Sequence, residues 1–323
     1  MPTAYCLLPT VFCLLISLAS MAYGQSAPWD PPIFERQGLG KPVRFAVESI
    51  PVSSVGPAQT LGAAIADRIA FSFKKTEPKL IILSVPVPVT SKIERIVQTV
   101  TDRFPRAVVV GLSSEANFTN RLENAQSAVS AWAVSGGNIK ISAALADMEL
   151  DEFDSPRSVA NYLHQTVLKT KLDKAYLVLS ALDSTQTDEI VTELSSKENN
   201  RIPVIAMTAP GTHPALFFAS RRIQNGCAII SIAGSVAIDA LAIQDGSVKP
   251  LSEKKNALEE SNLYCQCALV CLPAVSDVSA VKNEIQKSLG KLTPFLVRGS
   301  QNAADRSSPP AAGTAILFST PRY

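Results

Sequence analysis

The chain has 323 residues, of which 46 % are hydrophobic and 18 % charged, and this balance excludes a disordered protein. Thirty basic residues face 28 acidic ones, and we find no Lys/Arg cluster, so the sequence argues against nucleic acid as a partner. Aromatic residues are scarce at 6 %, which argues against a base- or sugar-stacking platform. The length suits one large domain or two smaller ones.

The first 24 residues carry no charge and contain an apolar run that ends in small residues. Ala22 and Gly24 fit the small-residue rule for signal peptidase, so we predict a signal peptide over 1–24 and an exported protein, periplasmic or extracellular. One alternative is an uncleaved membrane anchor, because the run approaches spanning length. A wrongly assigned start codon is the other. We expect no membrane contact outside this segment.

Residues 25–42 are crowded with proline and glycine, which predicts a linker. An alternating pattern over 43–47 indicates the first strand. Residues 60–74 then place apolar side chains at helical spacing, which predicts a helix.

The most informative feature is an internal repeat of an apolar strand, a helical stretch and a second apolar strand. Its strands lie at 79–84 and 107–113, at 174–180 and 203–208, and at 266–271 and 295–300. A helical crossover between two strands favours a parallel pair, and continuous apolar runs are typical of a sheet covered on both faces. The sequence therefore predicts an α/β fold with a mixed, mostly parallel, layered sheet built from repeated βαβ-like units.

Further elements lie between and after the copies. We expect strands at 140–145, 227–232, 240–243 and 315–319 and a helix over 158–169. Asp245-Gly246 indicates a tight turn after the strand at 240–243. Residues 125–135 are small and apolar and receive no assignment.

Four cysteines follow the predicted signal peptide: Cys227, Cys265, Cys267 and Cys271. We expect buried free thiols, because cysteine is among the most buried residue types. Disulfides are the alternative in an oxidising compartment. The spacing is not that of a zinc site, and no metal ligands are assigned.

Leu80–Ser84, the helix after it, and the strand from Ala107 that closes on Gly111-Leu112-Ser113-Ser114-Glu115 resemble the FIST domain, a module of F-box and intracellular signal-transduction proteins. The second copy and the strands at 227–243 follow in the family's order. The resemblance implies a FIST-like N-terminal domain over 43–250 and a shortened C-terminal βαβ unit over 251–323. It also implies a sensory module for a small ligand, with amino acids as the expected class, and neither catalytic residues nor a cofactor.

The best site candidates are residues that follow strand ends: Gly111, Ser113, Ser114, Thr208 and Gly211. In open α/β sheets ligands sit beyond the carboxyl ends of strands, where glycine and hydroxyl residues present hydrogen-bond donors. The alternative is that these are ordinary turn residues.

Enzyme chemistry finds little support. Glu115 stands where a nucleophile elbow needs glycine, and no phosphate-binding glycine motif is present. His213 is interpreted as a loop histidine, since no carboxylate or nucleophile partner is visible. The acidic residues of 147–154 are interpreted as a solvated loop.

Two hypotheses follow. The first is an exported, non-enzymatic sensory or binding module for a small ligand near Ser113. The second is a structural or interaction protein whose ligand site has decayed. A cleft lined by polar groups would favour the first hypothesis, and a cleft filled by Leu216, Phe217 or Phe218 would favour the second.

Overall fold

The computed structural model describes residues 43–52, 57–74, 76–86, 93–114, 116–119, 122–125, 128–136, 139–151, 153–167, 173–198, 202–209, 214–219, 221–234, 237–244, 247–250, 263–272, 293–298 and 313–321. All of them belong to one compact unit, Gly40–Tyr323. The predicted signal peptide and linker, Gly211, His213 and the predicted helix of the third repeat lie outside these residues.

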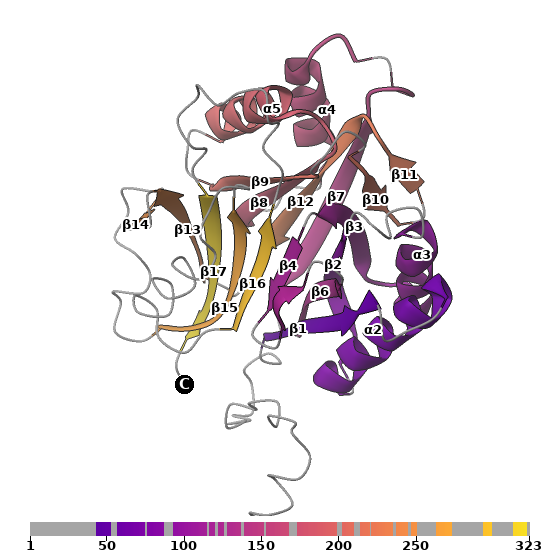
Figure 1. Ribbon diagram of the computed structural model, residues 1–323. Coiled ribbons are helices and arrows are strands. Elements are labelled where there is room, and N and C mark those ends of the chain that lie inside the picture. The colour runs from indigo at the N-terminus through magenta and orange to yellow at the C-terminus, as the bar shows by residue number, and fades with distance from the viewer. Residues whose placement is uncertain are drawn as a thin grey trace, which may run out of the picture. The chain divides into compact units, whose positions relative to one another are not determined.

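The first module is a sheet with two helices (Figure 1). Its elements are β1 (Arg44–Pro51), α2 (Ala58–Phe73), β2 (Pro78–Pro86), α3 (Ile93–Arg103), β3 (Val108–Ser114) and β6 (Ala128–Ser135). The sheet order is β1-β6-β2-β3, with β2 and β3 parallel and β6 antiparallel to both of its neighbours. α2 begins after Pro57 and buries Leu61, Ile65, Ile69 and Phe73, the residues whose spacing predicts it.

The second module repeats the first. Its elements are β7 (Lys140–Asp147), α4 (Pro156–Thr166), β8 (Asp173–Ser180), α5 (Ser184–Lys197), β9 (Val204–Thr208) and β12 (Gly226–Ala233). The sheet order is β7-β12-β8-β9, and β8 and β9 are parallel. α4 starts at a capping box of Ser155 and Ser158, and the Asp183 carboxylate accepts a hydrogen bond from the Gln186 N–H at the start of α5.

The third module has the same strand order. Its strands are β13 (Ala237–Gln244), β15 (Leu263–Leu272), β16 (Thr293–Arg298) and β17 (Gly313–Pro321), in the order β13-β17-β15-β16. β14 (Ser247–Pro250) pairs antiparallel with β13, and the turn predicted at Asp245-Gly246 lies outside the described residues.

Two short hairpins lie between modules. The first, β4 (Ala116–Thr119) and β5 (Leu122–Ala125), follows β3 and pairs with β16 of the third module. The second, β10 (Leu216–Phe218) and β11 (Arg221–Ile223), follows β9 and pairs with β3 of the first module. Strands from both sides of residue 250 therefore share the third sheet.

The first two sheets pack face to face with helices outside. The core between them includes Leu80, Ile82 and Trp132 of the first sheet and Leu177 and Ile230 of the second. The alternate residues of the first sheet, such as Ile81 and Leu83, pack with α2 and α3, while Val178 and Ile229 of the second pack with α4 and α5. Each of these sheets is thus covered on both faces, as the continuous apolar runs predict.

The expectation of a mostly parallel sheet is wrong. Each predicted βαβ unit does supply a parallel pair, namely β2–β3, β8–β9 and β15–β16. The other pairings among the described strands are antiparallel, because β6, β12 and β17 return between the first and second long strands of their modules. The mixed α/β fold class, with parallel and antiparallel pairs in one sheet, is confirmed.

Candidate functional site

Gly111 and Ser113, two of the predicted site residues of β3, lie on the helix-covered face of the first sheet. A Cβ added at Gly111 would stand 2.6 Å from Cγ2 of Val97 on α3 and 3.4 Å from Cβ of Phe217 on β10. Glycine is therefore used here for close packing of a helix and a neighbouring strand. The position leaves no space for a ligand.

Ser113 is also engaged within the protein. It is 1 % exposed, and its Oγ accepts a hydrogen bond from the Ala215 N–H at 3.1 Å. The Ser113 N–H donates in turn to the Ala215 carbonyl at 2.9 Å. Ala215, which precedes β10, thus bonds to both the N–H and the hydroxyl of Ser113. Ser114 ends β3 opposite Pro86, and only its backbone is described.

Thr208 does not join Ser113 in one site. It ends β9 opposite Ser180, on the face where Val204 and Ala206 pack against α4 and α5. Ser113 shares its face with Val109, which packs against the helices of the first module. The two sheets are stacked face to face, so Ser113 and Thr208 lie on the two outer, helix-covered faces, on opposite sides of the sandwich. Their role in ligand binding stays a prediction.

A row of buried serines crosses the inner face of the first sheet. Ser49 of β1, Ser130 of β6 and Ser84 of β2 occupy matched register positions and are 5 %, 0 % and 1 % exposed. The Ser49 and Ser130 hydroxyl oxygens lie 2.8 Å apart. β1, β2 and β3 run in one direction, so the row lies near their carboxyl ends, and β4 of the third sheet contacts β1, β2 and β6.

Sequence reasoning missed this serine row. Ser49 and Ser130 stand in segments with no repeat motif, and Ser130 lies in the stretch that received no assignment. The available signal was the serine that closes the apolar run of β2, at Ser84. Its neighbours across the sheet become visible only when β6 is known to return between β1 and β2.

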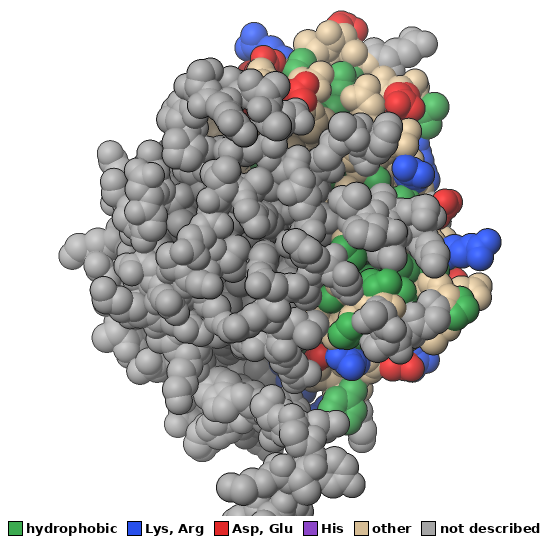
Figure 2. Space-filling view, in the orientation of Figure 1, with side chains coloured by type: hydrophobic (Ala, Val, Ile, Leu, Met, Phe, Trp, Pro, Cys, Tyr) green, Lys and Arg blue, Asp and Glu red, His purple; other side chains and the backbone are tan. Residues whose placement is uncertain are grey.

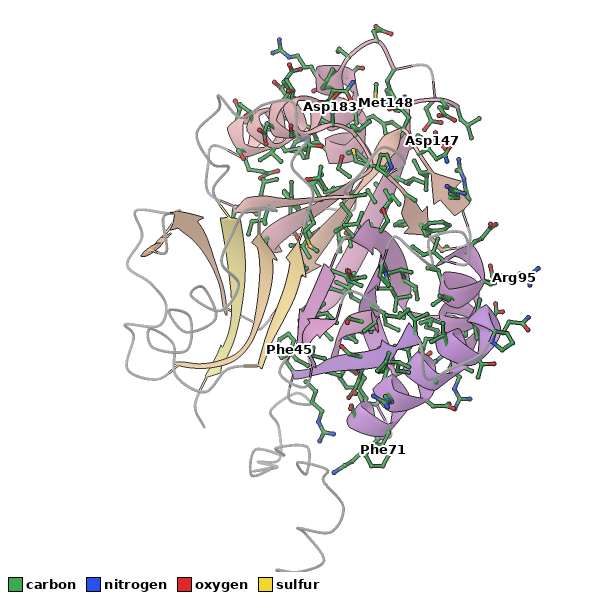
Figure 3. All side chains as sticks on the ribbon, viewed as in Figure 1. Phe45, Phe71, Arg95, Asp147, Met148 and Asp183 are labelled. Atoms are coloured by element: carbon green, nitrogen blue, oxygen red, sulfur yellow. The ribbon has the colours of Figure 1, made fainter. Side chains whose placement is uncertain are left out.

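The acidic loop is partly structural, which corrects its interpretation as fully solvated. Asp147 is 5 % exposed, and its carboxylate accepts hydrogen bonds from the Glu149 N–H at 3.2 Å and from the Arg221 guanidinium at 3.1 Å (Figure 3). Asp151 accepts a hydrogen bond from the Asp147 N–H. These bonds fix the turn after β7. Among the side chains that the structure describes, no His/Cys/Asp/Glu group is arranged to hold a metal.

A second polar cluster lies between α4, α5 and β8. The Nε2 atom of His164 is 2.8 Å from Oε1 of Glu198, and the buried Tyr176 hydroxyl donates to Asp173 at 3.1 Å. Burial, with the two carboxylates beside it, raises the pKa of the Tyr176 hydroxyl far above its ordinary value. The Tyr176 hydroxyl therefore stays protonated and serves as a hydrogen-bond donor, which links β8 to Glu198 at the end of α5.

Cys227 is a buried free thiol on β12, as the sequence predicts. Burial raises the pKa of this thiol to about 12, so it stays protonated and unreactive at neutral pH. The side chains of Cys265, Cys267 and Cys271 are not described.

The described part of the surface in Figure 2 carries basic and acidic side chains interspersed, in line with the balanced composition. The helices that the structure describes are all too short or too polar to cross a membrane.

Comparison with solved structures gives low similarity. With T. maritima PurL complexed with ATP, the chain has 11 % identity and a TM-score of 0.28, covering 87 % of this chain and 72 % of that one. With thiamine monophosphate kinase from Aquifex aeolicus, identity is 12 % and the TM-score 0.23, covering 96 % and 87 %. We transfer no property from these enzymes. Comparison with curated proteins found no match.

Comparison with family models gives a match to the FIST N domain over residues 79–253, more than half of the 323 residues. The matched range starts with the first repeat, which carries the resemblance in the sequence, and ends just after β14. The chain therefore belongs to the FIST N domain family.

Proposed function

We propose that this chain is an exported, non-enzymatic sensory module that binds a small polar ligand such as an amino acid. Membership of the FIST family supports the sensory part, since FIST domains are sensory domains of signal transduction. The observation that carries the ligand proposal is the row of Ser49, Ser130 and Ser84, which lies near the carboxyl ends of β1 and β2 and the start of the antiparallel β6. In α/β sheets this is where ligands bind.

The serine row suits a small polar molecule. Hydroxyl groups both donate and accept hydrogen bonds, so they can take either the ammonium or the carboxylate end of an amino acid. β4 of the third sheet lies close to all three strands that carry these serines.

The test is a thermal-shift titration of residues 25–323 against amino acids and small carboxylates. A ligand that binds the native state raises the melting temperature in a dose-dependent way. We expect Ser84→Ala and Ser130→Ala to abolish the shift. Ser113→Ala is the matched control: it removes a buried hydroxyl bonded to Ala215, so it should lower the melting temperature of the free protein and leave the ligand shift intact.

The second candidate function, a structural or interaction protein with a decayed ligand site, is favoured by one observation. Leu216 and Phe217 of β10, both 0 % exposed, lie opposite Leu112 and Gly111, the residues that precede Ser113 on β3. Absence of any shift at millimolar ligand across the panel would leave this second function as the better account.

Export has its own test. Expression with a functional secretion system should yield a mature protein that begins at Gln25, as measured by intact mass. A mature chain that retains residues 1–24 and fractionates with membranes would favour the anchor, and a soluble full-length chain inside the cell would contradict export.

A further inference from the structure

The three modules have equivalent edge strands: β3, β9 and β16. The equivalence follows from register, because the ladders begin at Arg44↔Ser135, Lys140↔Ala233 and Ala237↔Ser319. Counting four residues along the first strand of each module leads to Ala131, Ile229 and Ala315 on the return strands β6, β12 and β17. From there the register continues across the two parallel strands as Ala131–Leu83–Gly111, Ile229–Val178–Ala206 and Ala315–Val270–Leu296. Gly111, Ala206 and Leu296 are therefore equivalent residues.

Two of these edges are occupied in the same way. β10 adds antiparallel to β3 and places Phe217 opposite Gly111. β4 adds antiparallel to β16 and places Phe118 opposite Leu296. In both cases a short hairpin from a different module brings a phenylalanine to the equivalent register position. Two of the three equivalent edge strands are thus covered by an added antiparallel strand with phenylalanine at the same register position.

The third edge, β9, has no added strand among the described residues. The Tyr176 N–H donates to the Pro203 carbonyl, and the Ala209 N–H donates to the Ser180 carbonyl, so alternate residues of this segment turn toward β8. The backbone groups of Val204, Ala206 and Thr208 therefore point to the open side. On β3 the equivalent Val109 and Ser113 use these groups to bind the β10 segment.

Side-chain exposure agrees with an open edge. Val204, Ala206 and Thr208 are half-buried, whereas Val109 and Ser113 are 3 % and 1 % exposed beneath β10. The helices show the same contrast. The buried positions Ile93, Ile96, Val97 and Val100 of α3 match Thr187, Ile190, Val191 and Leu194 of α5 in spacing. Val97, which contacts the Gly111 position, is buried, but Val191 is half-buried.

The segment of the third module that corresponds to the two hairpins lacks the required chemistry. By the order of the other two modules, this segment is residues 299–312, between β16 and β17. That sequence, GSQNAADRSSPPAA, contains no aromatic residue and no large apolar residue. Residues 299–312 therefore cannot supply a counterpart of Phe217 and Phe118, and the equivalent position of the third module leaves the β9 edge without its aromatic residue.

We propose that β9 is a docking edge for an extended segment of a partner protein. The segment adds antiparallel to Val204–Thr208 and places an aromatic side chain opposite Ala206, against Val191 of α5. Main-chain hydrogen bonds supply general affinity, and the aromatic position supplies specificity. This inference goes beyond ligand binding and does not depend on the serine row.

The experiment uses residues 25–323 and a synthetic peptide with the sequence of Pro214–Ile223, which already performs this role on β3. We expect the peptide to slow amide hydrogen exchange at Ala206 and Thr208, whose N–H groups point to the open side. The same peptide with alanine in place of Phe217 should bind about tenfold more weakly, as expected for loss of an aromatic anchor. Ala206→Pro in the protein removes an outward N–H and should abolish binding with little change in melting temperature.

The peptide comparison uses the unaltered protein, so it remains decisive even if Ala206→Pro does not fold. Equal binding of the two peptides, or no added protection at Ala206 with millimolar peptide, would overturn the proposal. So would slow exchange at Ala206 in the free, dilute protein, since the edge would then already be occupied. Protection that rises with protein concentration alone would assign the edge to a second copy instead of a partner.

Discussion

Replacing Phe217 by alanine is expected to lower the free energy of unfolding by about 3–5 kcal/mol, the usual cost of truncating a fully buried phenylalanine. The side chain is 0 % exposed and packs in the helix-side core of the first sheet, opposite Gly111. The Arg222 guanidinium also lies over its ring, 6.0 Å from the centroid, as a cation–π contact. Urea unfolding followed by circular dichroism measures the loss.

The matched control is Phe71→Ala on α2. Phe71 is 70 % exposed and projects away from the helix in Figure 3. Its removal should change the free energy of unfolding by no more than about 0.5 kcal/mol. A loss of less than about 1 kcal/mol for Phe217→Ala would mean that β10 packs only weakly against the first sheet. The strand end at Ser113 would then again be a candidate ligand site.

The repeats were the most predictable part of the fold. Long apolar runs at 79–84 and 174–180 mark strands buried on both faces, and helical spacing locates α2, α3, α4 and α5. These signals are local, because each reports the period of one element against a core. The crossover rule then gives the parallel pairs correctly.

The return strands were harder to predict. β6 has the sequence AVSAWAVS, in which alanine and serine give little strand preference and no alternation, although all eight of its residues are buried. Inserting β6 between β1 and β2 makes the first sheet largely antiparallel. Which strands become neighbours is set by long-range packing, and no local pattern carries that information.

The predicted site residues and the serine row both lie near the carboxyl ends of strands. The sequence could not show on which face of the sheet each hydroxyl side chain lies. Ser113 and Thr208 both lie on helix-covered faces, whereas Ser84 and Ser130 lie on the inner one. A shift of one residue along a strand moves a side chain to the opposite face, and only the sheet pairing fixes which face is inside.

The other large effect is expected at Gly226, the first residue of β12. A Cβ at this position would lie 2.3 Å from the Ala146 carbonyl oxygen, 2.7 Å from Cγ2 of Ile223 and 3.1 Å from the Cα of Asp147. Two of these atoms belong to the backbone of β7, so the strands themselves must separate. We expect Gly226→Ala to lower the free energy of unfolding by about 3 kcal/mol, the upper end of the overpacking range.

The separation should be visible beyond stability. The Met148 N–H donates to the Asn225 carbonyl at 2.8 Å, and Arg221 bonds to Asp147 at 3.1 Å, so both contacts flank the displaced strands. Amide exchange at Met148 should therefore accelerate in Gly226→Ala. Asn225→Ala is the control, because its exposed side chain can be removed while the backbone carbonyl remains. Equal exchange rates and equal stability in the two variants would contradict the close approach of β7 and β12, and with it the turn that fixes Asp147.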